Sequence, residues 1–266
     1  MKKFPITPIF IPANKLNYIE KAIKHDADGI IFDLEDAVPI SEKEMARENL
    51  FNFLSSNSLK IPSYIRINDL NDVNGKSDLN LFKSLDFKII IPKIETTEVL
   101  KNIPDNMSTI PLIETPLALR NLEGIASNSS VVGLMFGAAD YSAALGSDMS
   151  WEALLYARSK IIIECSINNL FSIDSPFMIT SSQEDLEKEC RLSKSIGFNS
   201  KAAINPSQIN VIKKYFLPTD DEILEAQEII KEFNKSEKAV FSFNGKMIDK
   251  PILRIMENRL KALDIK

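Results

Sequence analysis

The chain of 266 residues contains one histidine and two cysteines, which excludes several common catalytic and metal-binding arrangements. His25 ends a helical pattern just before a predicted strand, so it is expected to be structural or exposed. Ser–His and Cys–His nucleophile pairs are therefore excluded. Cys165 and Cys190 lie far apart in helical patterns, which excludes a CxxC redox motif and a cysteine metal knuckle and predicts packing roles for both.

Long hydrophobic runs and a strong excess of charge are also lacking. No stretch approaches about 18 apolar residues, and Pro8 and Pro12 interrupt the first apolar segment. We therefore expect no transmembrane helix and no signal peptide, and we assign the protein to the cytoplasm. The net charge is −5 with acids and bases interspersed, which excludes a basic stripe for nucleic acid and a polybasic membrane patch. Small-molecule chemistry is the expected function class.

Apolar strand patterns alternate with amphipathic helical patterns, as is typical of repeated βα units. The expected strands begin near Ile9, Gly29, Tyr64, Ile89, Ile110, Val131, Phe171 and Lys201. The clearest helical patterns between them cover residues 41–54, 116–126, 151–169 and 183–195. Eight such units predict a closed (β/α)8 TIM barrel. A doubly wound open sheet is the alternative, disfavoured because no GxGxxG follows the first strand.

Two of the helical patterns carry a start signal. Ser41 with Glu44, and Ser182 with Asp185, have the spacing of a capping box, in which the serine hydroxyl accepts a hydrogen bond from the first helical turn. Both serines are therefore predicted to cap their helices.

The segment after the eighth unit is not needed to close a barrel. A helical pattern over 222–233 is followed by Asn244-Gly245 between alternating apolar residues, which predicts a two-residue β-hairpin. A closing helix is expected after Pro251. We predict a barrel domain over 1–217 and a C-terminal extension over 218–266 that packs on a neighbouring subunit.

One strand runs directly into a cluster of acids. The motif FDLEDAVP places Asp33, Glu35 and Asp36 within four residues, directly after an apolar strand. Like charges this close usually face a cation, a metal with its waters or a hydrogen-bond network. The alternative is a surface turn whose acids cap the following helix.

Three other expected strands also end in polar groups. Arg66 ends YIRIN, Glu114 ends PLIET, and Asp140 follows the strand in GLMFGAAD. The carboxyl ends of parallel strands converge on one mouth, where active sites lie. We therefore expect these side chains to share a site.

The ordered motifs FDLEDAVP, YIRIN, IPKIE, PLIETP, FGAADY, YAR, GFNSKAAINPSQI and GKMIDKP resemble the citrate lyase β-subunit family. That family is a branch of the HpcH/HpaI aldolase superfamily and includes malyl-CoA and citramalyl-CoA lyases. The resemblance extends from Ile9 to Pro251. It implies a Mg2+-dependent TIM barrel that cleaves or forms a carbon–carbon bond between an acyl thioester and a 2-oxo acid, and that works as a homotrimer or a larger homo-oligomer such as a hexamer.

The resemblance also implies roles for individual residues. Glu114 and Asp140 match metal ligands, and Arg66 matches the substrate-binding arginine. Glu35 and Asp36 match acids that lie around metal-bound waters. These roles fit the chemistry, because two carboxylates and waters suit octahedral Mg2+, and a fixed guanidinium stabilises the oxygen charge of a departing thioester enolate.

Four further positions complete the expected site. Asp249 of GKMIDKP matches a catalytic acid supplied across a subunit interface. Gly137, Ala138 and Ala139 are small, which leaves room for the carboxylate of the 2-oxo acid to approach backbone N–H groups.

The basic residues among these motifs each have two interpretations. Arg66 could instead form a structural ion pair with Asp33 or Glu35. Lys93 and Lys201 are interpreted as neutralising barrel acids and not as Schiff-base lysines, because the carboxylates already account for a metal mechanism.

The chain departs from the family pattern in two respects. Ile6-Thr7 stands where the family typically has Arg-Ser before the first strand, so an arginine associated with the carrier's phosphates is missing. Asn205-Pro206 replaces His-Pro near the eighth strand. The histidine base that HpaI-type aldolases use near the metal is also absent.

We predict a Mg2+-dependent lyase that converts a hydroxyacyl thioester into an acyl thioester, on CoA or a carrier protein, and a small 2-oxo acid. One alternative is a metal-dependent aldolase or synthase acting on a carrier-free 2-oxo acid, which the missing arginine favours. The other is a non-catalytic subunit that binds a metal or a 2-oxo acid. It is disfavoured because every candidate catalytic position holds a competent residue.

Overall fold

The computed structural model describes residues 4–235 and 240–261. The chain divides into two compact units, Met1–Lys213 and Lys214–Lys266, each considered by itself below. Within the described residues no helix is long and apolar enough to cross a bilayer. The packing of the C-terminal extension on a neighbouring subunit stays a prediction.

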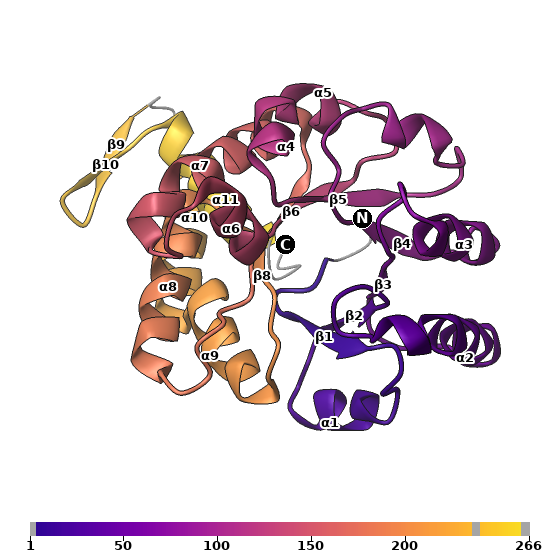
Figure 1. The fold of residues 1–266 in the computed structure, drawn as a ribbon. Coiled ribbons are helices and arrows are strands. Elements are labelled where there is room, and N and C mark those ends of the chain that lie inside the picture. Colours follow the sequence, from indigo (N-terminus) through magenta and orange to yellow (C-terminus); the bar gives the residue numbers. More distant parts are fainter. Residues whose placement is uncertain (1–3, 236–239, 262–266) are drawn as a thin grey trace. The chain divides into compact units, whose positions relative to one another are not determined.

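The first unit is a closed barrel of eight parallel strands in sequential order (Figure 1). The strands are β1 (Pro8–Pro12), β2 (Gly29–Asp33), β3 (Ser63–Arg66), β4 (Lys88–Ile91), β5 (Thr109–Ile113), β6 (Gly133–Phe136), β7 (Phe171–Asp174) and β8 (Ser200–Lys201). A parallel bridge between Ile9 and Ala203 returns the sheet from the last strand to the first. The predicted TIM barrel is therefore confirmed, and the open sheet is excluded.

The barrel interior is filled by side chains from all around the sheet. One buried cluster comprises Ile31, Tyr64, Ile90, Ile110, Leu112, Met135, Ile173 and Ala202. Each member is at most 3% exposed, and β-branched and aromatic side chains predominate, as suits strands buried on both faces. Full burial of one large apolar side chain stabilises the fold by about 1.5–3 kcal/mol, so this cluster is a main source of the barrel's stability.

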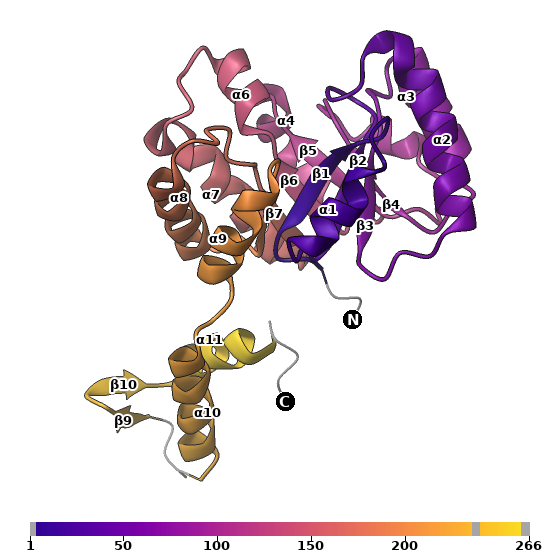
Figure 2. The ribbon, with the colours of Figure 1, turned by 90° about the horizontal axis from the view of Figure 1, so that it is seen from below.

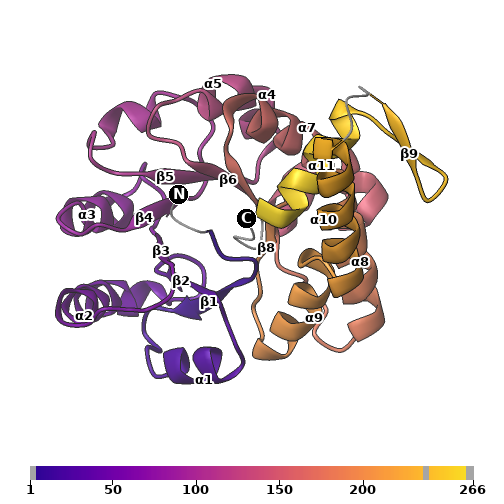
Figure 3. The ribbon, with the colours of Figure 1, turned by 180° about the vertical axis from the view of Figure 1, so that it is seen from behind.

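Helices surround the ring of strands (Figure 3). They are α1 (Tyr18–Lys24), α2 (Lys43–Ser56), α3 (Val73–Phe82), α4 (Pro116–Arg120), α5 (Leu122–Ala126), α6 (Ala138–Leu145), α7 (Trp151–Asn168), α8 (Gln183–Ile196) and α9 (Pro206–Phe216). Short 3-10 turns occur at η1 (Ile40–Glu42) and η2 (Val99–Asn102). Cys165 and Cys190 are buried within α7 and α8, as predicted. His25 is exposed at the end of α1, also as predicted.

The two predicted helix caps have different outcomes. Ser182 caps α8 by accepting a hydrogen bond from the backbone N–H of Asp185. Ser41 does not cap α2, because it lies inside the 3-10 turn η1 and the α-helix begins only at Lys43. The single helix expected over 116–126 is also divided, since α4 ends at Arg120 and α5 begins at Leu122.

The second unit contains α10 (Asp220–Lys235), a hairpin of β9 (Phe241–Phe243) and β10 (Lys246–Ile248), and α11 (Lys250–Lys261). Asn244 and Gly245 have φ of 49° and 77°, the left-handed conformations that a type I′ turn requires, so the predicted hairpin is confirmed. Figure 2 shows the hairpin extending from the side of α10. A small apolar core joins the helices to the hairpin and includes Ala226, Ile248 and Met256.

Candidate active site

A pocket of about 330 Å3 lies at the carboxyl ends of the barrel strands. The predicted site residues that line it are Asp36, Arg66, Glu114, Gly137, Ala138, Ala139 and Asp140. They follow β2, β3, β5 and β6, so the expected convergence of strand ends is observed. Glu35 joins the same group through an ion pair with Arg66. Asp249 belongs to the C-terminal unit, where its carboxylate accepts a hydrogen bond from the Ile252 N–H at the start of α11.

Asp33 organises the acidic turn, although it was not among the predicted site residues. It ends β2, and its carboxylate accepts hydrogen bonds from the backbone N–H groups of Glu35 at 2.9 Å and Ala37 at 3.1 Å. The Lys43 ammonium stabilises the turn by donating hydrogen bonds to the backbone carbonyls of Leu34 and Glu35. Asp33 and Lys43 therefore hold the DLED turn, whereas η1 and the helix α2 that follow it begin without a side-chain cap.

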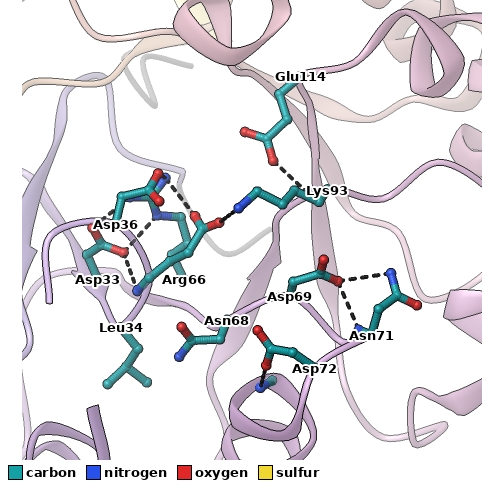
Figure 4. A network of polar contacts seen from close by, with 12 residues as sticks. Asp33, Leu34, Asp36, Arg66, Asn68, Asp69, Asn71, Asp72, Lys93 and Glu114 are labelled. Carbon is teal, nitrogen blue, oxygen red and sulfur yellow. Dashed lines mark hydrogen bonds and ion pairs between the residues drawn. The ribbon is translucent and has the colours of Figure 1, made fainter. Parts of the chain in front are cut away.

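Arg66 is held in one orientation by these acids (Figure 4). Asp33 and Arg66 are direct partners in the β2–β3 register, and Nε and Nη2 of Arg66 donate to the Asp33 carboxylate at 2.8 and 2.6 Å. Nη1 lies 3.1 Å from Glu35 and 3.7 Å from Asp36. The alternative ion pair is thus present, but it is made within the pocket lining. Although burial opposes its charge, the hydrogen bonds that Arg66 donates to Asp33 raise the pKa of Arg66.

Lys93 connects two of the candidate carboxylates. Its backbone N–H donates to Oε1 of Glu114 at 2.6 Å, and its ammonium lies 3.0 Å from Glu35. Lys93 has a φ of 52°, which is uncommon outside glycine and stores backbone strain. This conformation directs the N–H towards Glu114. Lys93 therefore neutralises a site acid, in agreement with the interpretation from sequence.

The pocket has an excess of negative charge. Glu114 is 2% exposed, and burial, together with the nearby carboxylates of Glu35 and Asp140, raises its pKa to about 8 against the opposing hydrogen bond from Lys93. Burial also raises the pKa of Glu35, although Arg66 opposes the shift. Carboxylates in such an environment require a further cation to remain ionised together.

Gly137 gives Glu114 the space that it occupies. A Cβ atom at residue 137 would lie 2.6 Å from the Cβ of Glu114 and 2.9 Å from its Oε2. The Gly137 N–H donates to the Ile113 carbonyl, so it is not available to a ligand. The N–H groups of Ala138 and Ala139 begin α6, where helical N–H groups have no partner within the helix. Ala138 and Ala139 therefore remain the candidates for offering N–H groups to a ligand carboxylate, and Gly137 remains a candidate for leaving it room.

Substituting Gly137 with alanine is expected to lower Mg2+ affinity by about 10- to 100-fold, the usual range for disturbing a group that orients a metal ligand. The added methyl would displace the Glu114 carboxylate while leaving the φ of −106° unstrained. Calorimetric Mg2+ titration measures the effect. Gly124→Ala in α5 is the matched control, because its new methyl would meet only Thr97, outside the pocket. Equal Mg2+ affinity in both folded variants would argue against Glu114 as a ligand.

A buried charge network lies beside the pocket, and of its members only the neutralising role of Lys201 was predicted. Asp174 accepts from Nε of Arg158 at 2.9 Å and from the ammonium of Lys201 at 3.0 Å. Although burial opposes ionisation, these two cations hold the pKa of Asp174 below its usual range. The Cζ atom of Arg158 also lies 5.3 Å from the ring centroid of Phe136 and 4.6 Å from that of Trp151. The network fixes the ends of β7 and β8, and Lys201 is committed to it, as expected for a neutralising lysine.

The residues present fit a magnesium ion. Glu114 directly after β5 and Asp140 in the first turn of α6 supply oxygen donors, and both line the acidic pocket. No group of three or more histidine, cysteine or acidic side chains forms a metal cluster within residues 4–235 and 240–261. Magnesium binds through one or two carboxylates and keeps several waters, so two protein ligands are sufficient.

The fold and the pocket define a (β/α)8 barrel protein with an acidic, metal-compatible site at the carboxyl ends of its strands. The chain belongs to the HpcH/HpaI aldolase/citrate lyase family, whose model matches residues 7–206. It is 27% identical to the mitochondrial citramalyl-CoA lyase of Rattus norvegicus, over 94% of this chain and 83% of that protein. It is 29% identical to citrate lyase subunit beta of Haemophilus influenzae, over 92% of each.

The fold is also similar to that of CitE from Mycobacterium tuberculosis, solved in complex with magnesium, acetoacetate and coenzyme A. The TM-score is 0.86 and the sequence identity is 27%, and 98% of each chain is covered.

Proposed function

We propose that this protein is a Mg2+-dependent carbon–carbon lyase that cleaves a hydroxyacyl thioester into an acyl thioester and a small 2-oxo acid, or catalyses the reverse condensation. The observation that carries the proposal is the pocket at the strand ends, where Asp36, Glu114 and Asp140 line the same cavity as the oriented guanidinium of Arg66. The family supports it, since relatives named citramalyl-CoA lyase and citrate lyase subunit beta align over most of the chain.

Glu114 and Asp140 would hold the metal through their carboxylates, and waters would complete its coordination. When bound, Mg2+ polarises the oxygen on C2 and the adjacent carboxylate of the substrate. The N–H groups of Ala138 and Ala139 offer neutral donors to that carboxylate. Glu35 and Asp36 would orient the waters around the ion.

Cleavage requires the substrate hydroxyl to lose its proton as the adjacent carbon–carbon bond breaks. Asp36 lines the pocket and is the side chain that we assign to accept this proton. The electron pair of the broken bond passes to the thioester fragment, which leaves as an enolate. Arg66 stabilises the enolate oxygen, and because Asp33 already fixes the guanidinium, little reorganisation is needed.

The enolate carbon must then receive a proton, and we assign this step to Asp249 of a neighbouring subunit. Asp249→Asn is expected to reduce lyase activity by about 10²-fold, within the usual contribution of a general acid. Metal and oxo-acid binding should persist, because Glu114, Asp140 and Arg66 are unchanged. The decisive measurement co-assembles Asp249→Asn with Arg66→Ala. If the acid acts in trans, some sites in the mixture regain both groups and activity rises above that of either parent.

Subunit exchange is verified in the same samples by native mass spectrometry of differently tagged chains. Activity no higher than the weighted sum of the parents, in mixtures that have exchanged subunits, would reject the composite site.

The arginine missing at Ile6 does not support the alternative of an aldolase or synthase acting on a carrier-free 2-oxo acid. The N–H groups of Ile6 and Thr7 donate to the Asp28 carboxylate before β1 begins, whereas the pocket lies at the opposite, carboxyl ends of the strands. The residue at position 6 therefore does not line this chain's own pocket. An acyl thioester on CoA or on a carrier protein remains the proposed substrate.

The function is tested in the direction of condensation. Acetyl-CoA, a 2-oxo acid and the protein are incubated with Mg2+, and the hydroxyacyl-CoA product is detected by mass spectrometry. Product that depends on both Mg2+ and the protein is expected. A protein that binds both substrates with Mg2+ but forms no product would support the non-catalytic alternative.

A further inference from the structure

Apart from its charged groups, the candidate active site has an almost entirely apolar wall. Leu112, Met135 and Phe136 form its deep part and are at most 3% exposed. Met149, Met178 and Ile204 also line the pocket but are 41%, 49% and 36% exposed. Large apolar side chains gathered at a pocket opening mark a surface that a ligand covers.

The pocket offers no free positive charge to a second anionic group. Among the described residues Arg66 is the one cation that lines the pocket, and the nearby Lys93 ammonium is paired with Glu35 at 3.0 Å. The Arg66 guanidinium faces three carboxylates, those of Asp33, Glu35 and Asp36, and it is already assigned to the enolate oxygen of the thioester fragment. One ligand carboxylate would have partners in a bound metal and in the N–H groups of Ala138 and Ala139 at the start of α6. A second would meet either the site acids or the apolar wall, and both placements are costly.

We infer that the 2-oxo acid handled by this site carries no charge other than the carboxylate next to its oxo group, and that its remaining substituent is a small alkyl group. The inference rests on the proposed function and specifies its substrate class. The pocket of about 330 Å3 is at the small end of ligand sites and would also have to hold the reacting end of the acyl thioester, which limits the alkyl group to a few carbons.

The test compares two 2-oxo acids of the same skeleton and different charge. In 4-methyl-2-oxopentanoate, two methyl groups replace the two oxygens of the distal carboxylate of oxaloacetate. Each compound, freshly dissolved, is titrated into the full-length protein with Mg2+, and pyruvate serves as the smallest monocarboxylate. We expect both monocarboxylates to bind at least roughly tenfold more tightly than oxaloacetate, since the wall repels or desolvates the second charge.

A charge-introducing variant tests the role of the wall directly. Met178→Lys adds a cation at an exposed lining position, and Met178→Gln is the matched control with similar length and no charge. In the lysine variant, the affinity for oxaloacetate relative to that for 4-methyl-2-oxopentanoate should rise by about tenfold or more. In the glutamine variant, this ratio of affinities should change far less.

Three results would overturn the inference. Oxaloacetate binding as tightly as the monocarboxylates in the unaltered protein would contradict it while leaving the proposed function intact. Equal shifts in the two Met178 variants would contradict the electrostatic role of the wall. Failure of every 2-oxo acid to bind in the presence of Mg2+ would instead reject the proposed function, and the inference with it.

Discussion

Replacing Glu114 with glutamine is expected to abolish Mg2+ binding at the site and to reduce lyase activity by about 10³-fold or more. The estimate follows from the several kcal/mol by which a bound cation stabilises the developing charge. Glu114 is buried, and its pKa of about 8 reflects the cost of ionising it beside Glu35 and Asp140. A neutral amide removes the charge that attracts the ion and leaves the size of the side chain unchanged.

The fold should survive this change, because the amide oxygen of glutamine still accepts the hydrogen bond from the Lys93 N–H. Glu95→Gln is the matched control: Glu95 does not line the pocket, and its backbone carbonyl accepts from Asn121 independently of its side chain. Calorimetry with Mg2+ and thermal unfolding are measured on both variants. A folded Glu114→Gln protein that keeps Mg2+ affinity and turnover would disprove the metal assignment.

Substituting Arg66 with lysine is expected to reduce kcat by about 10²- to 10³-fold, roughly 3–4 kcal/mol of transition-state stabilisation. A lysine keeps the positive charge, but it cannot reproduce the planar guanidinium, which donates in parallel to both oxygens of Asp33 while Nη1 faces Glu35 and Asp36. The lost interaction belongs mainly to the enolate, so kcat should fall much more than KM rises.

A purely structural ion pair would behave differently, and the chain contains one for comparison. Arg47 is buried against Asp78 and does not line the pocket. Arg47→Lys should lower the melting temperature with little effect on kcat. If Arg66→Lys gave the same pattern, with lower stability and unchanged kcat, the guanidinium would have no role in catalysis.

The fold was largely predictable because its signals are local. Each strand is a short apolar run, and alternation with helices leads directly to the barrel. Asn244-Gly245 predicted the hairpin, because few dipeptides other than Asn-Gly readily adopt two left-handed conformations in succession. The capping signal failed at Ser41 because the chain first makes the 3-10 turn η1, and the capping spacing alone does not distinguish such a turn from the first turn of an α-helix.

The site was predictable only in part. The residues that follow the strands reach the pocket because parallel topology brings their ends together, and this explains Arg66 and Glu114. The contacts that hold Arg66 and Glu114 in place depend on strand register and on the directions of side chains and backbone N–H groups. Asp33 faces Arg66 because the two are paired across β2 and β3, and Lys93 reaches Glu114 through an unusual backbone conformation. A motif gives neither of these facts.

The most direct test of the central claim is the release of a 2-oxo acid from a panel of hydroxyacyl thioesters, with Mg2+ present and after its removal by a chelator. We predict that at least one substrate yields equal amounts of 2-oxo acid and acyl thioester. The 2-oxo acid should be released only when Mg2+ is present, and its release should be lost in Glu114→Gln. Release that continues in full without metal, or products limited to the free hydroxy acid and thiol of simple thioester hydrolysis, would contradict the central claim.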